Sequence, residues 1–189
     1  MDKNFYFKTS CRMCARIKIQ KIMELTPTPP GNNFLNEDQI GDPEPVYPLE
    51  LYLCQDCGHI QLGHVVDPKI LYQNNYSYLS GTSAYFVAHL KDYASNMIKQ
   101  FDLTPKTLVS DIGSNDGTCL QFFQNRGMKV LGVDPATKIA QLATQNGVET
   151  VADFFSYDLA KRLRQEHGPA GFITSHNACA HIDNLDDVV

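Results

Sequence analysis

After Pro105, short apolar segments alternate with amphipathic ones, and this alternation limits the possible folds more than any other feature of the chain. Strands are predicted for residues 107–113, 129–134, 148–155 and 170–177. Helices are predicted between them, for residues 116–127, 135–147 and 156–168. Such alternation is typical of a parallel, doubly wound sheet. We therefore predict a Rossmann-like α/β domain over residues 105–189, incomplete at its C-terminus because such sheets normally contain further strands.

An apolar stripe with steps of three or four residues precedes this region and consists of Phe86, Leu90, Tyr93, Met97 and Phe101. This spacing predicts an amphipathic helix of roughly twenty residues. We expect residues 71–104 to form a linker region whose helix bridges two domains.

Two C-x-x-C pairs, Cys11 with Cys14 and Cys54 with Cys57, dominate the sequence upstream of that helix. Each such turn presents two thiolates to one ion, and two turns complete the tetrahedral shell that Zn²⁺ prefers. Four cysteines leave no open coordination position, so the expected zinc is structural rather than catalytic.

The segment between the two pairs is rich in proline. Six of the ten prolines fall within residues 27–48, where proline fixes φ and removes backbone donors, so we expect an extended loop. Residues 49–53 alternate in polarity like a short strand that leads into the second pair. We therefore predict a small, loop-rich zinc-binding domain over residues 1–70. His59 or His64 in place of a cysteine, a redox role and a different metal are the alternative interpretations.

The first predicted strand of the sheet runs into the turn D-I-G-S-N-D-G, which contains Gly113 and Gly117. A sharp turn at this point leaves room for a ligand beside the backbone. The dinucleotide fingerprint, however, requires glycine at the positions of Asn115 and Thr118. Asp116 in the same turn would also repel a pyrophosphate. The turn therefore disfavours a dinucleotide.

Acidic residues lie at or near the ends of three successive predicted strands. S-adenosylmethionine carries an ammonium group and a ribose but no phosphate, so acidic side chains suit it at this edge of the sheet. We expect Asp111 to bind the ammonium group and Asp134 to accept hydrogen bonds from both ribose hydroxyls. Asp153 and Phe154 are expected to contact the adenine. The alternative is that each acid is only a helix cap or a loop residue.

Several motifs together resemble one known family: CRMC, CQDC, PPGNNF, YSYLSGTS, DIGSNDGT and HNACAHIDNLDD. In their order and spacing the chain is similar to the bacterial sugar C-methyltransferases, which act on nucleotide-linked deoxysugars. The resemblance implies a class I, S-adenosylmethionine-dependent methyltransferase domain behind an N-terminal zinc-binding domain. It also implies deoxysugar biosynthesis, with carbon 3 of a 4-keto-2,6-dideoxy sugar as the methyl acceptor. Members of the family continue for about as many residues again.

The resemblance also implies roles for individual residues. Tyr76, Tyr78 and His181 occupy positions that the family places over the sugar ring, and His181 is the first candidate for the base. The S-N-D-G core implies that Asn115 and Asp116, like the two glycines of the turn, contact the cofactor. Asn177 is expected either to contact the amino-acid end of the cofactor or to position the sugar.

Charge and hydropathy restrict the partners. The chain has 16 Lys+Arg against 21 Asp+Glu and a net charge of −5, with no basic run suited to nucleic acid. No stretch has the length of a membrane span and the first residues lack a secretory signal, so we expect a cytoplasmic protein with a small-molecule substrate and no membrane partner.

Three other functions compete with a methyltransferase. A truncated, non-catalytic scaffold would retain zinc and cofactor binding, a zinc-ribbon regulator would contact nucleic acid, and an oxidoreductase would bind a dinucleotide. The acidic balance and the glycine turn disfavour the last two. The sugar, its nucleotide carrier, carbon or oxygen as the methyl acceptor, and the oligomeric state stay open.

Overall fold

The computed structural model describes residues 4–73 and 75–188. The chain divides into two compact units, one of residues 1–77 and 183–185 and one of residues 78–182 and 186–189. The boundaries expected at residues 70 and 104 stay predictions. Met1–Lys3, Asn74 and Val189, which fall within the expected domain ranges, lie outside the described residues.

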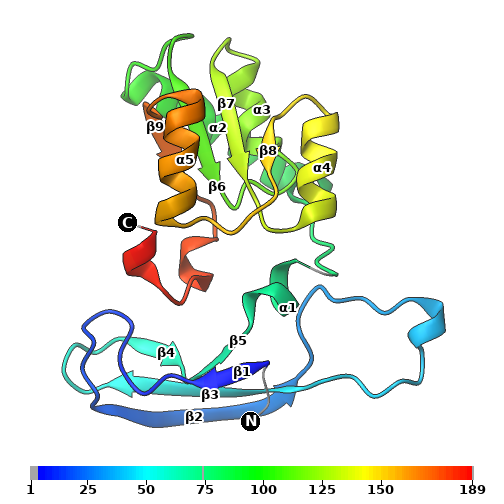
Figure 1. The fold of residues 1–189 in the computed structure, drawn as a ribbon, viewed down its shortest axis with the longest axis vertical. Helices are drawn as coiled ribbons and strands as arrows, with labels where there is room; N and C mark the ends of the chain where they lie inside the picture. The colour runs from blue at the N-terminus through cyan, green and yellow to red at the C-terminus, as the bar shows by residue number, and fades with distance from the viewer. Residues whose placement is uncertain (1–3, 74, 189) are drawn as a thin grey trace. The chain divides into compact units, whose positions relative to one another are not determined.

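The first unit contains two small antiparallel sheets (Figure 1). Strand β1 (Phe5–Phe7) pairs with β5 (His64–Val66), and a second sheet has the order β2 (Ile19–Thr28), β3 (Tyr47–Cys54) and β4 (Ile60–Leu62). The unit also contains two short helical turns, η1 (Glu37–Gln39) between β2 and β3 and α1 (Pro68–Tyr72) after β5. Among the described residues of this unit, the buried apolar side chains are those of Cys11, Pro30, Tyr47 and Cys54. Such a small apolar core needs a further source of stability, which a structural metal supplies.

The predicted loop over residues 27–48 is shorter in the structure than the prolines indicated. Strand β2 runs to Thr28, and β3 begins at Tyr47 and includes Pro48. Strand β2 lies at the edge of its sheet, and its residues after Ile19 are exposed, so it lacks the apolar alternation that marks a half-buried strand. Pro27 is tolerated there because an edge strand does not need every backbone donor, and the pairing is irregular between Leu25 and Thr28.

The second unit contains a four-stranded parallel sheet of order β8-β7-β6-β9. Its strands are β6 (Leu108–Ile112), β7 (Lys129–Val133), β8 (Thr150–Val151) and β9 (Phe172–Thr174). In chain order this arrangement is 3-2-1-4, with helices in the crossovers, which is the Rossmann-like order. The predicted α/β fold with a parallel sheet is therefore confirmed, and each predicted strand and helix is present.

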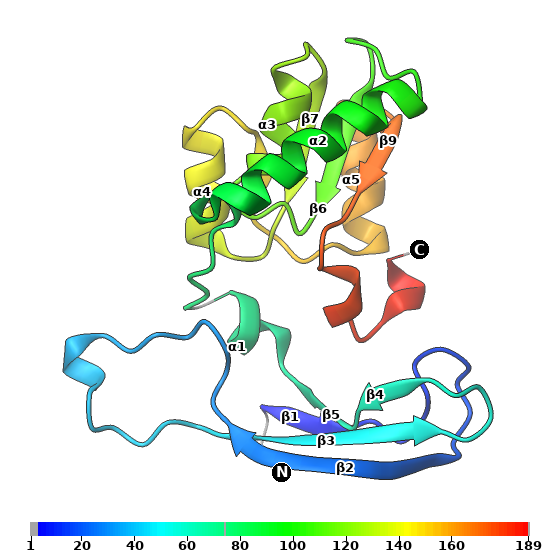
Figure 2. The same ribbon diagram turned by 180° about the vertical axis from the view of Figure 1, so that it is seen from behind.

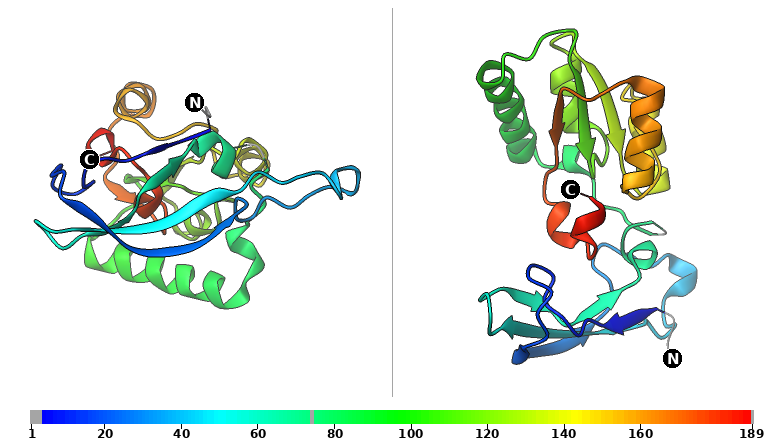
Figure 3. Two further views of the ribbon diagram at one scale, coloured as in Figure 1. Left: turned by 90° about the horizontal axis from the view of Figure 1, so that it is seen from below. Right: turned by 60° about the vertical axis from the view of Figure 1, so that its left-hand side comes forward.

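Helices cover both faces of this sheet. Figure 2 shows α2 (Ala84–Gln100) and α3 (Thr118–Gln124) on one face, whereas α4 (Thr137–Gln145) and α5 (Tyr157–His167) lie on the face turned toward the viewer in Figure 1. The right panel of Figure 3 shows the sheet edge-on between α2 and α5. Three short 3-10 turns complete the elements, η2 (Ser80–Thr82), η3 (Cys179–His181) and η4 (Leu185–Asp187). Within the described part of the chain, none of these helices has the length and apolar character that a membrane crossing requires.

Helix α2 belongs to the core of the second unit. Its buried residues Leu90 and Ala94 pack with Val109 of β6 and with Leu120 and Phe123 of α3. We expected this helix to bridge two domains, but its apolar stripe is used to cover the sheet. A separate cluster on the opposite face joins β7 to α5.

Candidate functional site

The four cysteines of the two C-x-x-C pairs meet in the first unit. Their sulfur atoms all lie within 4.8 Å of one another, with Cys11 Sγ 3.6 Å from Cys57 Sγ and Cys14 Sγ 3.6 Å from Cys54 Sγ. A tetrahedral zinc with Zn–S bonds of about 2.3 Å separates its sulfur ligands by about 3.8 Å. The four thiols therefore fit one zinc ion, and the two C-x-x-C pairs lie together, as expected of one shared site.

Both C-x-x-C turns close in the same way. The amide of Ala15 donates to the carbonyl of Cys11 at 2.9 Å, and the amide of Gly58 donates to the carbonyl of Cys54 at 2.9 Å. The residue after each pair has a left-handed backbone, with φ of 57° at Ala15 and 76° at Gly58. Glycine adopts this conformation without strain, and alanine does not. The metal-binding turn therefore imposes the backbone at Ala15, where no sequence signal marked it.

The local environment gives the four thiols different acidities. Burial opposes ionisation of Cys11, but amide donors from Cys14 and Met13 outweigh it and hold the pKa of Cys11 at about 7. The amide of Arg16 favours ionisation of Cys14, yet burial and the neighbouring thiols raise the pKa of Cys14 to about 12. Zinc binds thiolates, so loading the site must release protons.

The two histidines weighed as alternative ligands lie outside the sulfur cluster. His64 is on β5, where its ring contacts those of Phe5 and Phe7 and its Nδ1 is 3.6 Å from Glu50 Oε2. His59 contributes its backbone carbonyl, which accepts a hydrogen bond from the amide of Cys54. Among the described residues, the potential metal ligands that gather at this place are the four cysteines.

The predicted ligand-binding turn of the second unit lies between β6 and α3. Asp134, at the end of β7, holds this turn, because its Oδ2 accepts the amide of Asn115 at 2.8 Å and its Oδ1 accepts the amide of Ala136 at 2.9 Å. Asp134 is 5% exposed, and burial raises its pKa although the two amides oppose that shift. The carboxylate thus joins the ends of the two central strands.

The two glycines of the turn are required by packing as well as by backbone conformation. Gly113 has φ of 74°, and a Cβ there would lie 2.5 Å from the Cβ of Ala178. Gly117 has φ of 79°, and a Cβ there would lie 2.9 Å from the Cβ of Val148. Ala178 therefore occupies the position that a Cβ at Gly113 would take.

Asn115 and Asp116 hold the segment that leads into α2. Asn115 Nδ2 donates to the carbonyl of Tyr78 at 2.9 Å, and its Oδ1 accepts the amide of Ser80 at 2.8 Å. Asp116 Oδ2 accepts the amide of Gly81 at 2.8 Å. In the structure these two side chains therefore connect the S-N-D-G turn to the Y-L-S-G segment, and their predicted contact with a cofactor stays a prediction.

A buried polar cluster lies at the ends of β6 and β9. Ligand atoms of Asp111, Cys119 and His176 are within 4.8 Å of one another, and both Asp111 Oδ1 and His176 Nδ1 lack a hydrogen-bond partner. Asp111 is 2% exposed, and burial, assisted by the charge of Asp134, raises its pKa to about 8. Burial therefore favours the neutral form of Asp111.

The remaining predicted cofactor contacts lie at the same edge of the sheet. Asp153 follows β8, is exposed, and accepts the amide of Phe154 at 2.8 Å. Asn177 follows β9, is exposed, and has a left-handed backbone with φ of 56°. His181 is the exposed last residue of η3.

The two tyrosines proposed to act on a substrate lie in different units. Tyr76 belongs to the first unit, where it pairs with Asn33 through the backbone and its ring lies 5.7 Å from that of Tyr72. Tyr78 begins the second unit and its side chain is 40% exposed. The predicted contact of each tyrosine with a sugar substrate therefore stays a separate prediction.

Sequence reasoning missed Gln61, a buried residue of β4. Its Oε1 accepts the amide of Arg12 at 2.9 Å and its Nε2 donates to the carbonyl of Ser10 at 3.0 Å, which fixes the loop that carries the first cysteine pair. No sequence signal marked it, because a glutamine in a short strand is ordinarily exposed.

Comparison with known proteins gives two sequence matches. Residues 11–72 match the family model described as "Putative zinc binding domain". The chain is also 28% identical over 179 residues to the C-methyltransferase NovU of Streptomyces niveus, an alignment that covers 95% of this chain. The chain spans 42% of the length of that relative.

Solved structures give weaker matches. The plantazolicin methyltransferase BpumL, solved with a pentazolic desmethylPZN analogue and SAH, has a TM-score of 0.43 at 14% identity over 56% of this chain and 40% of that one. The MccD protein has a TM-score of 0.28 at 17% identity over 55% and 36%. We therefore assign the fold of the second unit from its own strand order and register, not from these matches. The sulfur cluster and the family match agree on the first unit: residues 11–72 are similar to a family described as a zinc-binding domain, and they contain the four cysteines whose sulfur atoms lie together.

Proposed function

We propose that the chain binds S-adenosylmethionine at the carboxyl edge of its parallel sheet and is the cofactor-binding part of a methyltransferase. The observation that carries this proposal is Asp134, a carboxylate at the end of β7 beside the glycine turn. The relationship to NovU, which is named a C-methyltransferase, supports it.

Asp134 has the hydrogen-bonding capacity that a ribose requires. Each of its carboxylate oxygens accepts one backbone amide, from Asn115 or from Ala136. A carboxylate oxygen has two lone pairs, so one acceptor site remains on each. Two neighbouring hydroxyls of a ribose can donate to these two sites, while the amide bonds keep the carboxylate in place.

The charge of the edge favours a cationic ligand over a diphosphate. Asp111, Asp116 and Asp134 gather around one turn, and Asp134 raises the pKa of Asp111 beyond the effect of burial. A pyrophosphate there would meet the carboxylates of Asp116 and Asp134, whereas the ammonium group of S-adenosylmethionine would stabilise ionised Asp111.

The proposed substrate is a nucleotide-linked 4-keto deoxysugar, methylated at carbon. The cofactor supplies the methyl group. The chain must remove a proton from the carbon next to the ketone and stabilise the enolate oxygen that results, so that this carbon takes the methyl group and a neutral thioether leaves. We assign the proton to the imidazole of His181 and the hydrogen bond to the enolate oxygen to Tyr78, which belongs to the same unit. Tyr76, in the first unit, is a separate candidate for that hydrogen bond. Thiolate ligands suit a reducing compartment, so we place the protein in the cytoplasm.

Calorimetric titration of the zinc-loaded chain with S-adenosylmethionine and S-adenosylhomocysteine tests the cofactor site. Asp134→Asn keeps the size of the side chain but replaces one acceptor oxygen with a donor, so we expect affinity for both ligands to fall at least tenfold. Asp92→Asn, an exposed change of the same type on α2, is the matched control and should bind like the wild type. Equal affinity in the wild type and Asp134→Asn would refute the site.

The role of Asp111 is tested by proton release. Free Asp111, with a pKa of about 8, is protonated at pH 7, and a cationic ammonium beside it lowers that pKa. Binding should therefore release close to one proton, measured as a dependence of the binding enthalpy on the ionisation enthalpy of the buffer. Asp111→Asn should abolish this dependence. Binding without proton release would assign the ammonium group to other residues.

Carbon methylation is tested with a nucleotide-linked 4-keto-2,6-dideoxy sugar and ¹³C-methyl-labelled cofactor. The carbon shift of the product methyl group distinguishes a C-methyl from an O-methyl product. A labelled O-methyl product would overturn the assignment of carbon as the acceptor, while leaving the cofactor site intact.

A further inference from the structure

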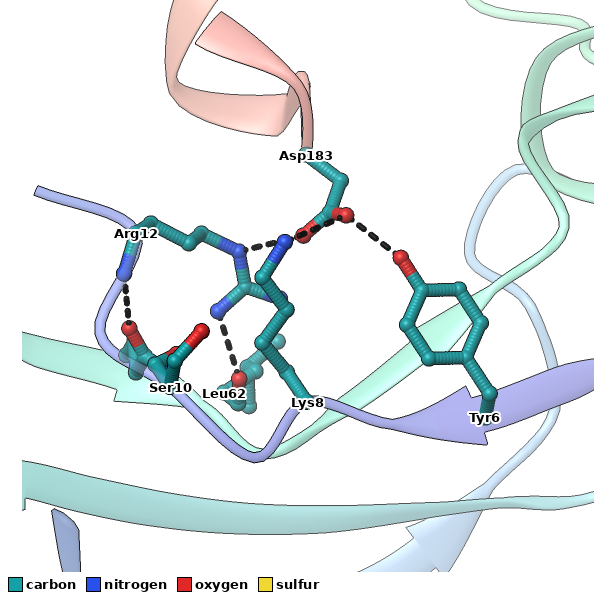
Figure 4. A network of polar contacts seen from close by, with 7 residues as sticks. Tyr6, Lys8, Ser10, Arg12, Leu62 and Asp183 are labelled. Carbon is teal, nitrogen blue, oxygen red and sulfur yellow. Dashed lines mark hydrogen bonds and ion pairs between the residues drawn. The ribbon is translucent and has the colours of Figure 1, made fainter. Parts of the chain in front are cut away.

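One acidic side chain near the end of the chain is bound by the zinc-binding domain. Asp183 Oδ2 accepts hydrogen bonds from Lys8 Nζ at 3.0 Å and from the hydroxyl of Tyr6, and Asp183 Oδ1 accepts one from Arg12 Nε at 2.8 Å (Figure 4). Residues 183–185 belong to the first unit although they lie between two segments of the second unit in sequence. The carboxylate thus meets three donors that lie 171 to 177 residues away along the chain.

One of the three donors, Arg12, makes further contacts besides its bond to Asp183. Arg12 lies inside the first C-x-x-C pair, its amide donates to Gln61 Oε1, and its Nη1 donates to the carbonyl of Leu62 at 2.7 Å. Gln61, which is 5% exposed, also donates to the carbonyl of Ser10. The guanidinium is therefore oriented by the metal-binding loop and by β4, as Figure 4 shows.

The charges match a single anionic group. Two cations and one hydroxyl surround one carboxylate, and the side chains of Lys8, Arg12 and Asp183 are only 24%, 15% and 22% exposed. Charge-assisted hydrogen bonds that are partly shielded from water are stronger than those of fully exposed pairs. Burial opposes ionisation of Asp183, but the bonds from Tyr6 and Lys8 and the nearby cations hold its pKa below its usual range.

We propose that Tyr6, Lys8 and Arg12 form a carboxylate-binding site on the zinc-binding domain, with Asp183 as its ligand, and that this site anchors the segment that follows His181. Because Arg12 lies between two zinc ligands, the metal-bound conformation of the loop also orients the anchor. The link to His181 as a base rests on the proposed function, whereas the anchor itself rests only on these contacts.

Hydrogen exchange measured by mass spectrometry on the full zinc-loaded chain tests the anchor. The amides of His181 and Ile182 donate to the carbonyls of Ala178 and Cys179, so their exchange reports opening of this segment. In Asp183→Asn we expect these amides to exchange at least tenfold faster. Asp186→Asn is the control, since it removes the same charge from an exposed neighbour. Equal exchange in the two variants would overturn the proposal.

Two further samples separate the anchor from general damage to the domain. Arg12→Gln should raise exchange of the same amides as Asp183→Asn does, and the double variant should add little, because both changes break one interaction. Removal of zinc from the wild type should also raise exchange, with no further rise in Asp183→Asn. Additive effects of the two substitutions would refute the interaction of Arg12 with Asp183. Unchanged exchange after zinc removal would refute the coupling of the anchor to the metal site. None of these measurements requires cofactor or substrate, so they stand apart from the methyltransferase proposal.

Discussion

Replacing Gly113 with alanine separates backbone strain from steric overlap at the turn of the second unit. A residue other than glycine at φ of 74° costs about 1 kcal/mol in strain. The new Cβ would also lie 2.5 Å from the Cβ of Ala178, and such overpacking costs about 1–3 kcal/mol. Gly113→Ala should therefore lower the free energy of unfolding by about 2–4 kcal/mol.

Gly147 provides the matched control. Its φ is 91°, but nothing lies within 4 Å of the position that its Cβ would occupy, so Gly147→Ala should cost only the strain, about 1 kcal/mol. Adding Ala178→Gly to Gly113→Ala removes the overlap and should recover the difference between the two single variants.

Urea unfolding followed by circular dichroism at the helix band measures these changes. Helices α2 to α5 lie in the second unit, whereas the first unit contributes the five-residue α1 and the short η1, so the helix signal reports the second unit. If Gly113→Ala and Gly147→Ala lose equal stability, or if Ala178→Gly does not rescue, the close approach of Ala178 to the turn is refuted.

Three other variants test separate features. Because the pKa of Asp111 is raised to about 8, its contribution to stability is present in acid and is lost as the pH rises from about 4 toward 8. Asp111→Asn should weaken this pH dependence of the unfolding free energy, and the variant should unfold at a higher urea concentration than the wild type at pH 8. An equal pH dependence in the variant and the wild type would show that Asp111 is not buried. Cys54→Ser should abolish the binding of one zinc per chain, as measured by metal analysis, whereas Cys119→Ser should retain it. The reverse result would show that the metal binds at Cys119 and not at the two C-x-x-C pairs. Asn115→Ala should raise amide exchange at Ser80 at least tenfold, since Ser80 then loses its acceptor, and unchanged exchange would contradict the contact.

Much of the second unit was predictable because its signals are local. Ser156 caps α5 by accepting the amide of Leu159, and Gly168 ends that helix with φ of 84°, as the residue types indicate. The parallel direction of the strands follows from their alternation with helices, because parallel strands need crossover connections. Their order in the sheet was not predicted. The meeting of the two C-x-x-C pairs at one site was likewise predictable, because four thiolates complete the shell of one zinc ion.

The features that sequence reasoning missed depend on partners far away in the chain. Strand β2 is exposed and lacks apolar alternation, so only its pairing with β3 defines it. Asn115 and Asp116 were expected to contact a cofactor, but their bonds to the segment after Tyr78 follow from tertiary packing. The same holds for Asp183, whose donors lie at the other end of the sequence.

The bonds from Asn115 and Asp116 to residues 78–81 have a mechanical consequence. They join residues 35 to 37 positions apart in sequence, so the segment that contains α2 and β6 is closed into a loop by these hydrogen bonds. A pulling force applied to the chain before Tyr78 would act on these hydrogen bonds before it acted on α2, and the bonds would share the force. Helix α2 is thereby shielded from pulling by the first unit, and the turn that carries the S-N-D-G residues would bear that load instead.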